Sequence, residues 1–236
     1  MSDSLLPNHQ LPSQPLLVHV VNLTQKGCSV YYRFLRKKLN LTNSLAAREN
    51  KWHRELDCVF STEYWNKIYR LTAEIKNDNR VKWLQYQIVR NSLYTNYKVH
   101  QFNNQVNPGC TFCIQQNREN AKTEIVSHLF VKCDIVEVLW SEVGSWLDTL
   151  GVKIPSNEKL LLFGCVDQSV SSVSNYIIPT VKYYIWVSRL NNNPLNVAGY
   201  KRFLYFKLEE LKNAYIYEKK DHVFNQFLVI FNSLSD

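Results

Sequence analysis

Three cysteines and one histidine lie near the middle of the 236-residue chain with a spacing suited to metal binding. Cys110 and Cys113 are followed by His128 and Cys133, in the pattern C-x2-C-x14-H-x4-C. Thiolate and imidazole groups are the ligands that Zn²⁺ takes in tetrahedral sites. Four such ligands leave no open position for a substrate. The pattern therefore predicts a structural zinc ion rather than a catalytic one.

The alternative interpretation is a set of buried or free thiols beside a core histidine. A redox C-x-x-C would need a thioredoxin-like βαβ setting, which this sequence lacks. His128 and Cys133 are five residues apart, too far around an ideal helix to share one face. We therefore expect a local distortion or a helix start between them. The four ligand atoms should converge to within ~4 Å of one another, because Zn–S and Zn–N bonds are only about 2.0–2.3 Å long.

The elements that position this cluster are predicted to be helices. Apolar residues recur in steps of three and four, and only a short run at residues 16–23 is β-like. Ser61 or Thr62 is the expected N-cap of one helix, and Gly151 is the expected end of another. The sequence indicates an all-α fold, an irregular multi-helix assembly with an embedded CCHC zinc-binding module. Helices are expected over residues 28–39, from about residue 62, and over 81–92, 126–150, 174–190, 195–217 and 221–234.

Breaks in this pattern suggest four segments. They are a flexible lead-in with a basic helix (1–50), a helical domain (51–105), the zinc-binding module (106–150) and a C-terminal helical region (151–236). Five tryptophans are expected in the core because large aromatic side chains are usually buried: Trp52, Trp65, Trp83, Trp140 and Trp146.

The composition fits a globular protein, since 45% of residues are hydrophobic and 20% are charged. No apolar run reaches the ~18–20 residues of a membrane span, and the first residues lack a basic signal-peptide region. We therefore expect an intracellular protein, cytoplasmic or nuclear, without a membrane partner. Residues 1–100 hold 15 lysines and arginines against 7 acidic residues, whereas residues 101–236 hold 13 of each. The net charge of +8 thus suggests a polyanionic partner, nucleic acid first, and a merely solvated basic face is the alternative.

Several short motifs surround the cluster in a fixed order. They are Lys51-Trp52 with Glu55-Leu56, Trp65-Asn66-Lys67-Ile68, Leu84 to Arg90, Tyr94 to Lys98, Pro108 to Cys113, His128-Leu129-Phe130 with Cys133, Trp140, Leu162-Phe163-Gly164, and Lys182 to Trp186 with Arg189. Together they resemble the C-terminal segment of LINE-type (non-LTR) retrotransposon reverse transcriptases, including its zinc-binding domain. The resemblance covers roughly residues 50–210. The interval between Cys113 and His128 is several residues longer than this family usually has.

The resemblance implies a role in holding template RNA and target DNA near a polymerase. The expected partners are RNA, DNA or both, and the polymerase part of a related element is a further possibility. Basic and aromatic side chains on the expected helices and loops are the candidate contacts. The phosphate contacts would be Arg33, Arg36, Lys37, Lys38, Lys76, Arg80, Lys82, Arg90 and Lys98, and the base-stacking rings would be Tyr94, Tyr97 and Phe112.

The chemistry of the parent enzymes is not expected here. The chain has eight aspartates but no Asp-Asp pair to hold two Mg²⁺ ions, and it has no Gly-rich phosphate loop. We therefore expect a non-catalytic fragment, separated from polymerase and endonuclease. A protein interaction or scaffold module that retains the zinc-stabilised fold is the main alternative, and an enzyme with different chemistry is the third. No role is assigned to Cys28, Cys58 or Cys165.

Overall fold

A computed structural model describes residues 42–75, 78–116, 121–166 and 172–235. The chain divides into two units, residues 1–50 and residues 51–236. Helix α3 (Thr42–Glu55) begins in the first unit, and the other described helices belong to the second. The expected run at 16–23 and helix at 28–39 lie outside the described residues.

The described residues of the second unit are helical apart from loops and one isolated β-bridge, which confirms the all-α class. The elements in chain order are α4 (Thr62–Glu74), α5 (Asn79–Val89), α6 (Asn96–His100), α7 (Thr111–Gln115), the π-helical turn η1 (His128–Lys132), α8 (Asp134–Thr149), α9 (Glu158–Phe163), α10 (Ser172–Leu190), α11 (Val197–Tyr217), the 3₁₀ segment η2 (Asp221–Phe227) and α12 (Leu228–Ser235).

Local signals in the sequence set several helix ends. Ser61 is the N-cap of α4, and its side chain accepts a hydrogen bond from the N–H of Tyr64. Asp78 caps α5 by accepting from two backbone N–H groups. Gly151 follows α8 with φ of +72°, a conformation that glycine adopts without strain. Pro179 lies inside α10, so this helix spans the proline.

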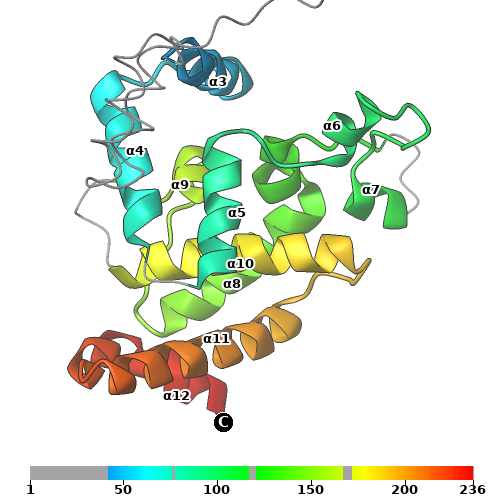
Figure 1. Cartoon of the computed structure of the whole chain (residues 1–236). Coiled ribbons are helices and arrows are strands. Elements are labelled where there is room, and N and C mark those ends of the chain that lie inside the picture. Colours follow the sequence, from blue (N-terminus) through cyan, green and yellow to red (C-terminus); the bar gives the residue numbers. More distant parts are fainter. Residues whose placement is uncertain (1–41, 76–77, 117–120, 167–171, 236) are drawn as a thin grey trace, which may run out of the picture. The chain divides into compact units, whose positions relative to one another are not determined.

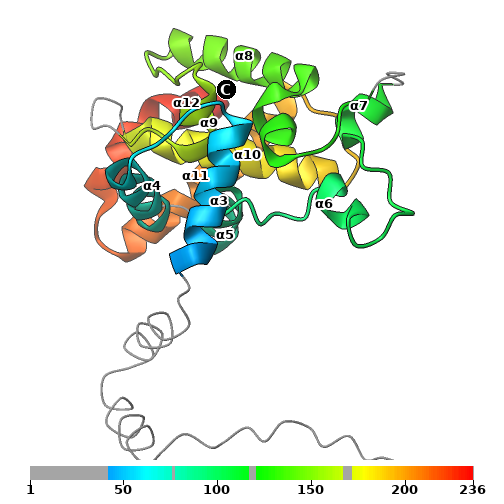
Figure 2. The ribbon, with the colours of Figure 1, turned by 90° about the horizontal axis from the view of Figure 1, so that it is seen from above.

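Helix α10 runs through the middle of the second unit (Figure 1). α5 packs on one side of α10 and α8 lies on the other, while α11 lies along α10 and carries η2 and α12 (Figure 2). Ile177, Val181 and Ile185 of α10 are fully buried. Among the described residues, one hydrophobic core runs from Trp52 to Ile230, so the segment predicted as the zinc-binding module shares its core with the helices before and after it.

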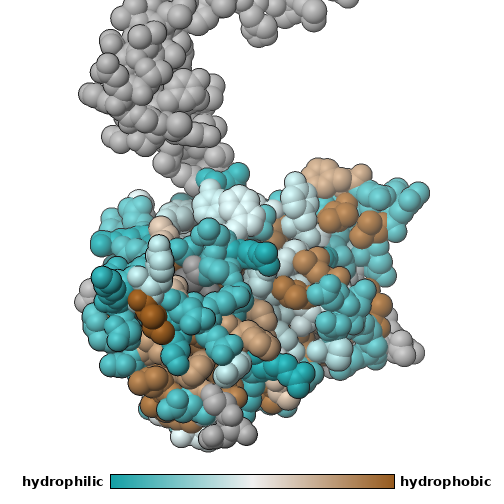
Figure 3. All heavy atoms as spheres, turned by 60° about the horizontal axis from the view of Figure 1, so that its bottom comes forward, coloured by the Kyte–Doolittle hydropathy of each residue, from teal (hydrophilic) through white to brown (hydrophobic). Residues whose placement is uncertain are grey.

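The surface seen in Figure 3 is mostly hydrophilic, with apolar side chains in separate small groups rather than one continuous patch. Within the described ranges, no helix combines the length and apolarity that crossing a bilayer requires.

Candidate metal centre

The first two cysteines lie on a short loop that closes onto a later segment of the chain. Gly109 and Thr123 form an antiparallel bridge, and the N–H of Cys110 donates to the carbonyl of Lys122 at 2.8 Å. Helix α7 begins directly after Cys110. Cys113 therefore follows about one helical turn later, which brings its sulfur beside that of Cys110.

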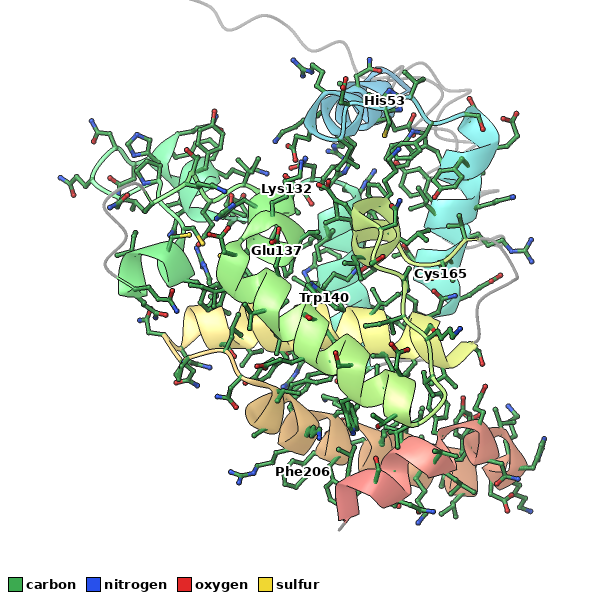
Figure 4. All side chains as sticks on the ribbon, turned by 180° about the vertical axis from the view of Figure 1, so that it is seen from behind. His53, Lys132, Glu137, Trp140, Cys165 and Phe206 are labelled. Carbon is green, nitrogen blue, oxygen red and sulfur yellow. The ribbon has the colours of Figure 1, made fainter. Side chains whose placement is uncertain are left out.

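The other two ligands come from the π-helical turn η1 and the residue that follows it. The N–H of Cys133 donates to the carbonyl of His128 at 2.9 Å, which is the five-residue hydrogen bond of a π-helix. Cys133 is also the N-cap of α8. Both alternatives expected from the spacing, a distortion and a helix start, are therefore present. Figure 4 shows sulfur atoms gathered between α7 and the start of α8.

All four side chains are buried and their ligand atoms lie within 4.8 Å of one another. The Sγ of Cys133 is 3.9 Å from the Sγ of Cys110 and 3.8 Å from that of Cys113, and the Nε2 of His128 is 3.5 Å from the Sγ of Cys113. Tetrahedral zinc with ordinary bond lengths would give S–S separations of about 3.8 Å and S–N separations of about 3.5 Å. These three pairs meet the expected ~4 Å limit, whereas the four atoms together span up to 4.8 Å and exceed it. The cluster is compatible with a metal site.

The pKa values of the three thiols shift in different directions. The hydrogen bond with Cys133, together with burial, raises the pKa of the Cys110 thiol, and burial followed by the charge on Cys133 raises the pKa of Cys113. Cys133 behaves oppositely. The hydrogen bond from Cys110, with further bonds from His128 and two N–H groups at the start of α8, lowers the pKa of Cys133 to about 4. A divalent cation would stabilise all three thiolates together.

A fully buried carboxylate, that of Glu124, anchors the cysteine loop. Its Oε1 accepts from the Nη2 of Arg189 at 2.8 Å and from the N–H of Asn96 at 2.9 Å, and its Oε2 accepts from both the N–H and the Oγ1 of Thr111 at 2.9 Å. Asn96 also donates to the carbonyl of Gly109 at 2.9 Å. Because Gly109 and Thr111 flank the first cysteine, this network ties the metal loop to α6 and α10.

The sequence patterns did not predict this carboxylate as a site residue. Glu124 is one acidic residue in a polar connection, and Arg189 lies 65 residues later. Arg189 was noticed only as part of the family resemblance. No local pattern pairs two residues at such a separation, so only the fold reveals the contact.

The predicted nucleic-acid contacts are spread over several places. Arg33, Arg36, Lys37, Lys38 and Lys76 lie outside the described residues. Arg80, Lys82 and Arg90 lie on or directly after α5, with Arg80 exposed and the other two half-buried. Tyr94 and Tyr97 are exposed, and the Nζ of Lys98 lies 5.1 Å from the ring centre of Tyr94.

Two expectations about aromatic residues are wrong. The ring of Phe112 is only 1% exposed because α7 turns it into the core, so it cannot stack on a base. Trp83, expected in the core, is 61% exposed on α5. Trp52, Trp65 and Trp140 are buried as expected, and Trp146 packs against the core while remaining half-buried.

The described residues thus define an all-α protein with a buried Cys3His cluster. No protein-family model matches the chain, and neither a curated protein nor a solved structure matches it. The resemblance to LINE-type reverse transcriptases rests on the ordered motifs quoted above.

Proposed function

We propose that this chain is a non-catalytic module that binds RNA or DNA and whose fold is held together by a structural zinc ion. The observation that carries the proposal is the buried Cys3His cluster, which adjoins a basic segment of the chain. The family resemblance supports the same conclusion, with the polymerase part of a related element as a further partner.

Zinc is the metal that fits the donor set. Three thiolates and one imidazole are soft ligands in the number and proximity that tetrahedral zinc requires. Cys110, Cys113 and Cys133 would supply sulfur and His128 would supply Nε2, the nitrogen that faces the sulfur of Cys113. When bound, the ion supplies a cross-link between the cysteine loop and the start of α8, with no position left for a substrate.

The segment that leads into the cluster favours a polyanionic ligand. Residues 79–116 contain four lysines and arginines but no aspartate or glutamate. These are Arg80, Lys82, Arg90 and Lys98, all of them predicted phosphate contacts. A stretch of chain with cations and no carboxylate of its own attracts phosphate groups, although Asp78, Glu210 and Glu218 line a cavity beside Lys82.

The lack of catalysis is proposed from the carboxylate pattern. Among the described residues, the Cys3His cluster is the only group of three or more His, Cys, Asp and Glu side chains placed to hold a metal. Two-metal phosphoryl transfer needs clustered carboxylates instead.

A protein-interaction module is the second candidate. Exposed apolar side chains on α11 and α12, including Phe206 and Val229, favour it. A cavity of about 320 Å³ beside Phe206, lined in part by Tyr205 and Leu234, could accept a side chain of such a partner.

Binding measured across a salt series separates the two functions. Zinc-loaded protein is titrated into labelled RNA and labelled DNA between about 50 and 200 mM salt, where phosphate contacts weaken steeply. A steep loss of affinity with rising salt supports nucleic-acid binding. No binding, or binding that does not respond to salt, contradicts it and favours the interaction module.

A further inference from the structure

Helix α5 presents an exposed aromatic residue where a core residue was expected. Trp83 stacks on Tyr86, with ring centres 5.5 Å apart and an angle of 21° between the planes. The guanidinium of Arg90 lies 4.9 Å from the centre of the Tyr86 ring and donates a hydrogen bond to its hydroxyl. We name Trp83, Tyr86 and Arg90 the aromatic strip.

Helical geometry explains why the strip faces away from the core. At about 100° per residue, Trp83, Tyr86 and Arg90 fall on the side of α5 opposite Leu84 and Ile88. Leu84 and Ile88 are buried, whereas Trp83 keeps 61% of its surface exposed. Tryptophan is rarely left so exposed, because its large apolar surface is usually removed from water.

The strip is preorganised for stacking. Arg90 holds Tyr86, and Tyr86 in turn holds the indole of Trp83, so an incoming flat ring would meet an ordered partner. Ordering the side chains beforehand lowers the entropy lost on binding. A second aromatic–cation pair, Tyr94 with Lys98, follows after the next turn of the chain.

The charges around the strip favour one class of partner. Arg80 and Lys82 lie on either side of it on the same helix. Residues 79–116 contain no carboxylate, although Asp78, Glu210 and Glu218 line a cavity beside Lys82. The outward positions of α5 next to the strip are cationic or amide groups, with no aliphatic side chain among them. Cations beside exposed rings suit a phosphate backbone with unpaired bases.

We propose that the aromatic strip of α5 is a stacking platform for unpaired bases of a single-stranded nucleic acid, with Arg80 and Lys82 contacting the adjacent phosphates. The platform rests on the proposed nucleic-acid function and names the site and the strandedness of its ligand. Duplexes are poor ligands for it, because their bases are already stacked on one another.

The test uses the zinc-loaded chain, labelled oligouridylate and oligothymidylate, and a duplex of the same length, with affinity read from fluorescence anisotropy. Trp83→Ala should weaken binding to the single strands about 5- to 150-fold, since one stacked base is lost. Trp83→Phe keeps a ring and should retain most of the affinity. Phe206→Ala is the matched control, because Phe206 is 55% exposed on α11 in a different part of the unit (Figure 4).

Salt dependence distinguishes the two kinds of contact. Trp83→Ala should leave the slope of log K against log salt unchanged, whereas Arg80→Gln should reduce its steepness by about one. Comparable binding by the RNA and DNA strands supports recognition of bases and phosphates, and a strong RNA preference would add a 2′-hydroxyl contact to the same platform.

Three outcomes would overturn the platform. If the wild type binds with a steep salt slope and Trp83→Ala binds equally well, the proposed function stands and the platform is rejected. Duplex affinity equal to single-strand affinity would do the same. If the wild type binds no nucleic acid, both the proposed function and the platform are rejected. If Trp83→Ala then abolishes binding to a protein partner, the strip is a protein interface. Circular dichroism verifies folding, and Tyr94→Ala gives a second test at the neighbouring ring.

Discussion

The backbone N–H of Cys133 donates to the carbonyl of His128 at 2.9 Å, and this π-type hydrogen bond turns the two side chains toward one point. In an ideal α-helix, residues five apart are separated by about 140° around the axis. The π turn places the imidazole before α8 and the thiol at its N-cap. The distortion brings both ligand atoms into the Cys3His cluster.

Cys113→Ser is expected to release the metal. We expect one zinc per chain in the wild type, measured by elemental analysis after exposure to a competing chelator, and a value near zero in the variant. Because metal binding and folding are linked, hydrogen exchange should accelerate within residues 105–147. Cys165→Ser, which removes a buried thiol outside the cluster, is the control. Zinc content that is near zero in the wild type, or equal in the two cysteine variants, would contradict the assignment.

Glu124→Gln is expected to weaken both the fold and the metal site. The change sets an amide N–H₂ against the donors of Thr111 or of Arg189, which leaves buried groups unpaired. Breaking a buried ion pair costs about 3–5 kcal/mol, and the loss of a group that supports a ligand lowers metal affinity about 10- to 100-fold. Denaturant unfolding and chelator competition measure the two effects.

Glu137→Gln is the matched control for that change, because Glu137 lies exposed on α8 (Figure 4). A double-mutant cycle of Glu124→Gln with Arg189→Met should show a coupling energy of about 0.5–3 kcal/mol. A stability loss no larger than that of Glu137→Gln would mean that the network does not hold the loop.

Local features of this fold could be predicted, whereas distant contacts could not. The Ser61 N-cap, the Gly151 helix end and the distortion between His128 and Cys133 each depend on a few neighbouring residues. The contact between Glu124 and Arg189 joins two parts of the chain that only tertiary packing brings together.

The exposure of Trp83, in contrast, could have been predicted from the helical period of the sequence. The helical period places it opposite Leu84 and Ile88, yet the usual burial of tryptophan suggested a core position. The period was the better guide. The prediction that Phe112 is exposed was wrong for a different reason. Its position between Cys110 and Cys113 indicated an exposed loop, but the short helix α7 buries its ring.

The purified protein is expected to have no polymerase or nuclease activity. Primer extension and strand cleavage should stay at background with Mg²⁺ or Mn²⁺, because the described residues offer no carboxylate cluster for two metals. Activity that copurifies with the protein through successive purification steps would contradict this expectation and favour an enzyme.

Asp78→Asn should reveal an ion pair that stabilises α5 against α11. Partial burial opposes ionisation of Asp78, but the hydrogen bond from Lys207 and the backbone N–H of Val81 outweigh it and lower the pKa of this carboxyl. The stabilisation is therefore present above pH 3.8 and is lost as the pH falls through the lowered pKa. Asparagine retains the N-cap, so the variant isolates the charge.

We expect Asp78→Asn to cost about 1–2 kcal/mol at pH 7 and progressively less in acid. Unfolding in denaturant at several pH values compares it with the wild type. Arg70→Gln, which breaks an exposed ion pair with Glu74, is the control and should cost less than Asp78→Asn. A deficit that stays constant down to acid pH would mean that the ionised carboxylate is not the source of the stability.

Lys182→Met should change how stability depends on pH at the alkaline end. Lys182 is completely buried, and its Nζ donates to the carbonyl of Leu162 at 2.7 Å. Burial lowers the pKa of this amine well below 10.5, so the folded chain holds it neutral while the unfolded chain protonates it. Unfolding therefore takes up a proton between the lowered pKa and pH 10.5, and stability contributed by this site rises with pH across that window.

Methionine fills a similar volume without an ionisable group, and the carbonyl of Leu162 still accepts from the side chain of Gln85 at 3.0 Å. The unfolding free energy of the variant relative to wild type should therefore fall as the pH rises toward 10.5, by at most about 1.4 kcal/mol per pH unit. Urea unfolding of both proteins at matched pH values measures this difference. A difference that does not vary with pH would show that Lys182 keeps its proton inside the fold, because only a change of charge on unfolding produces such a slope.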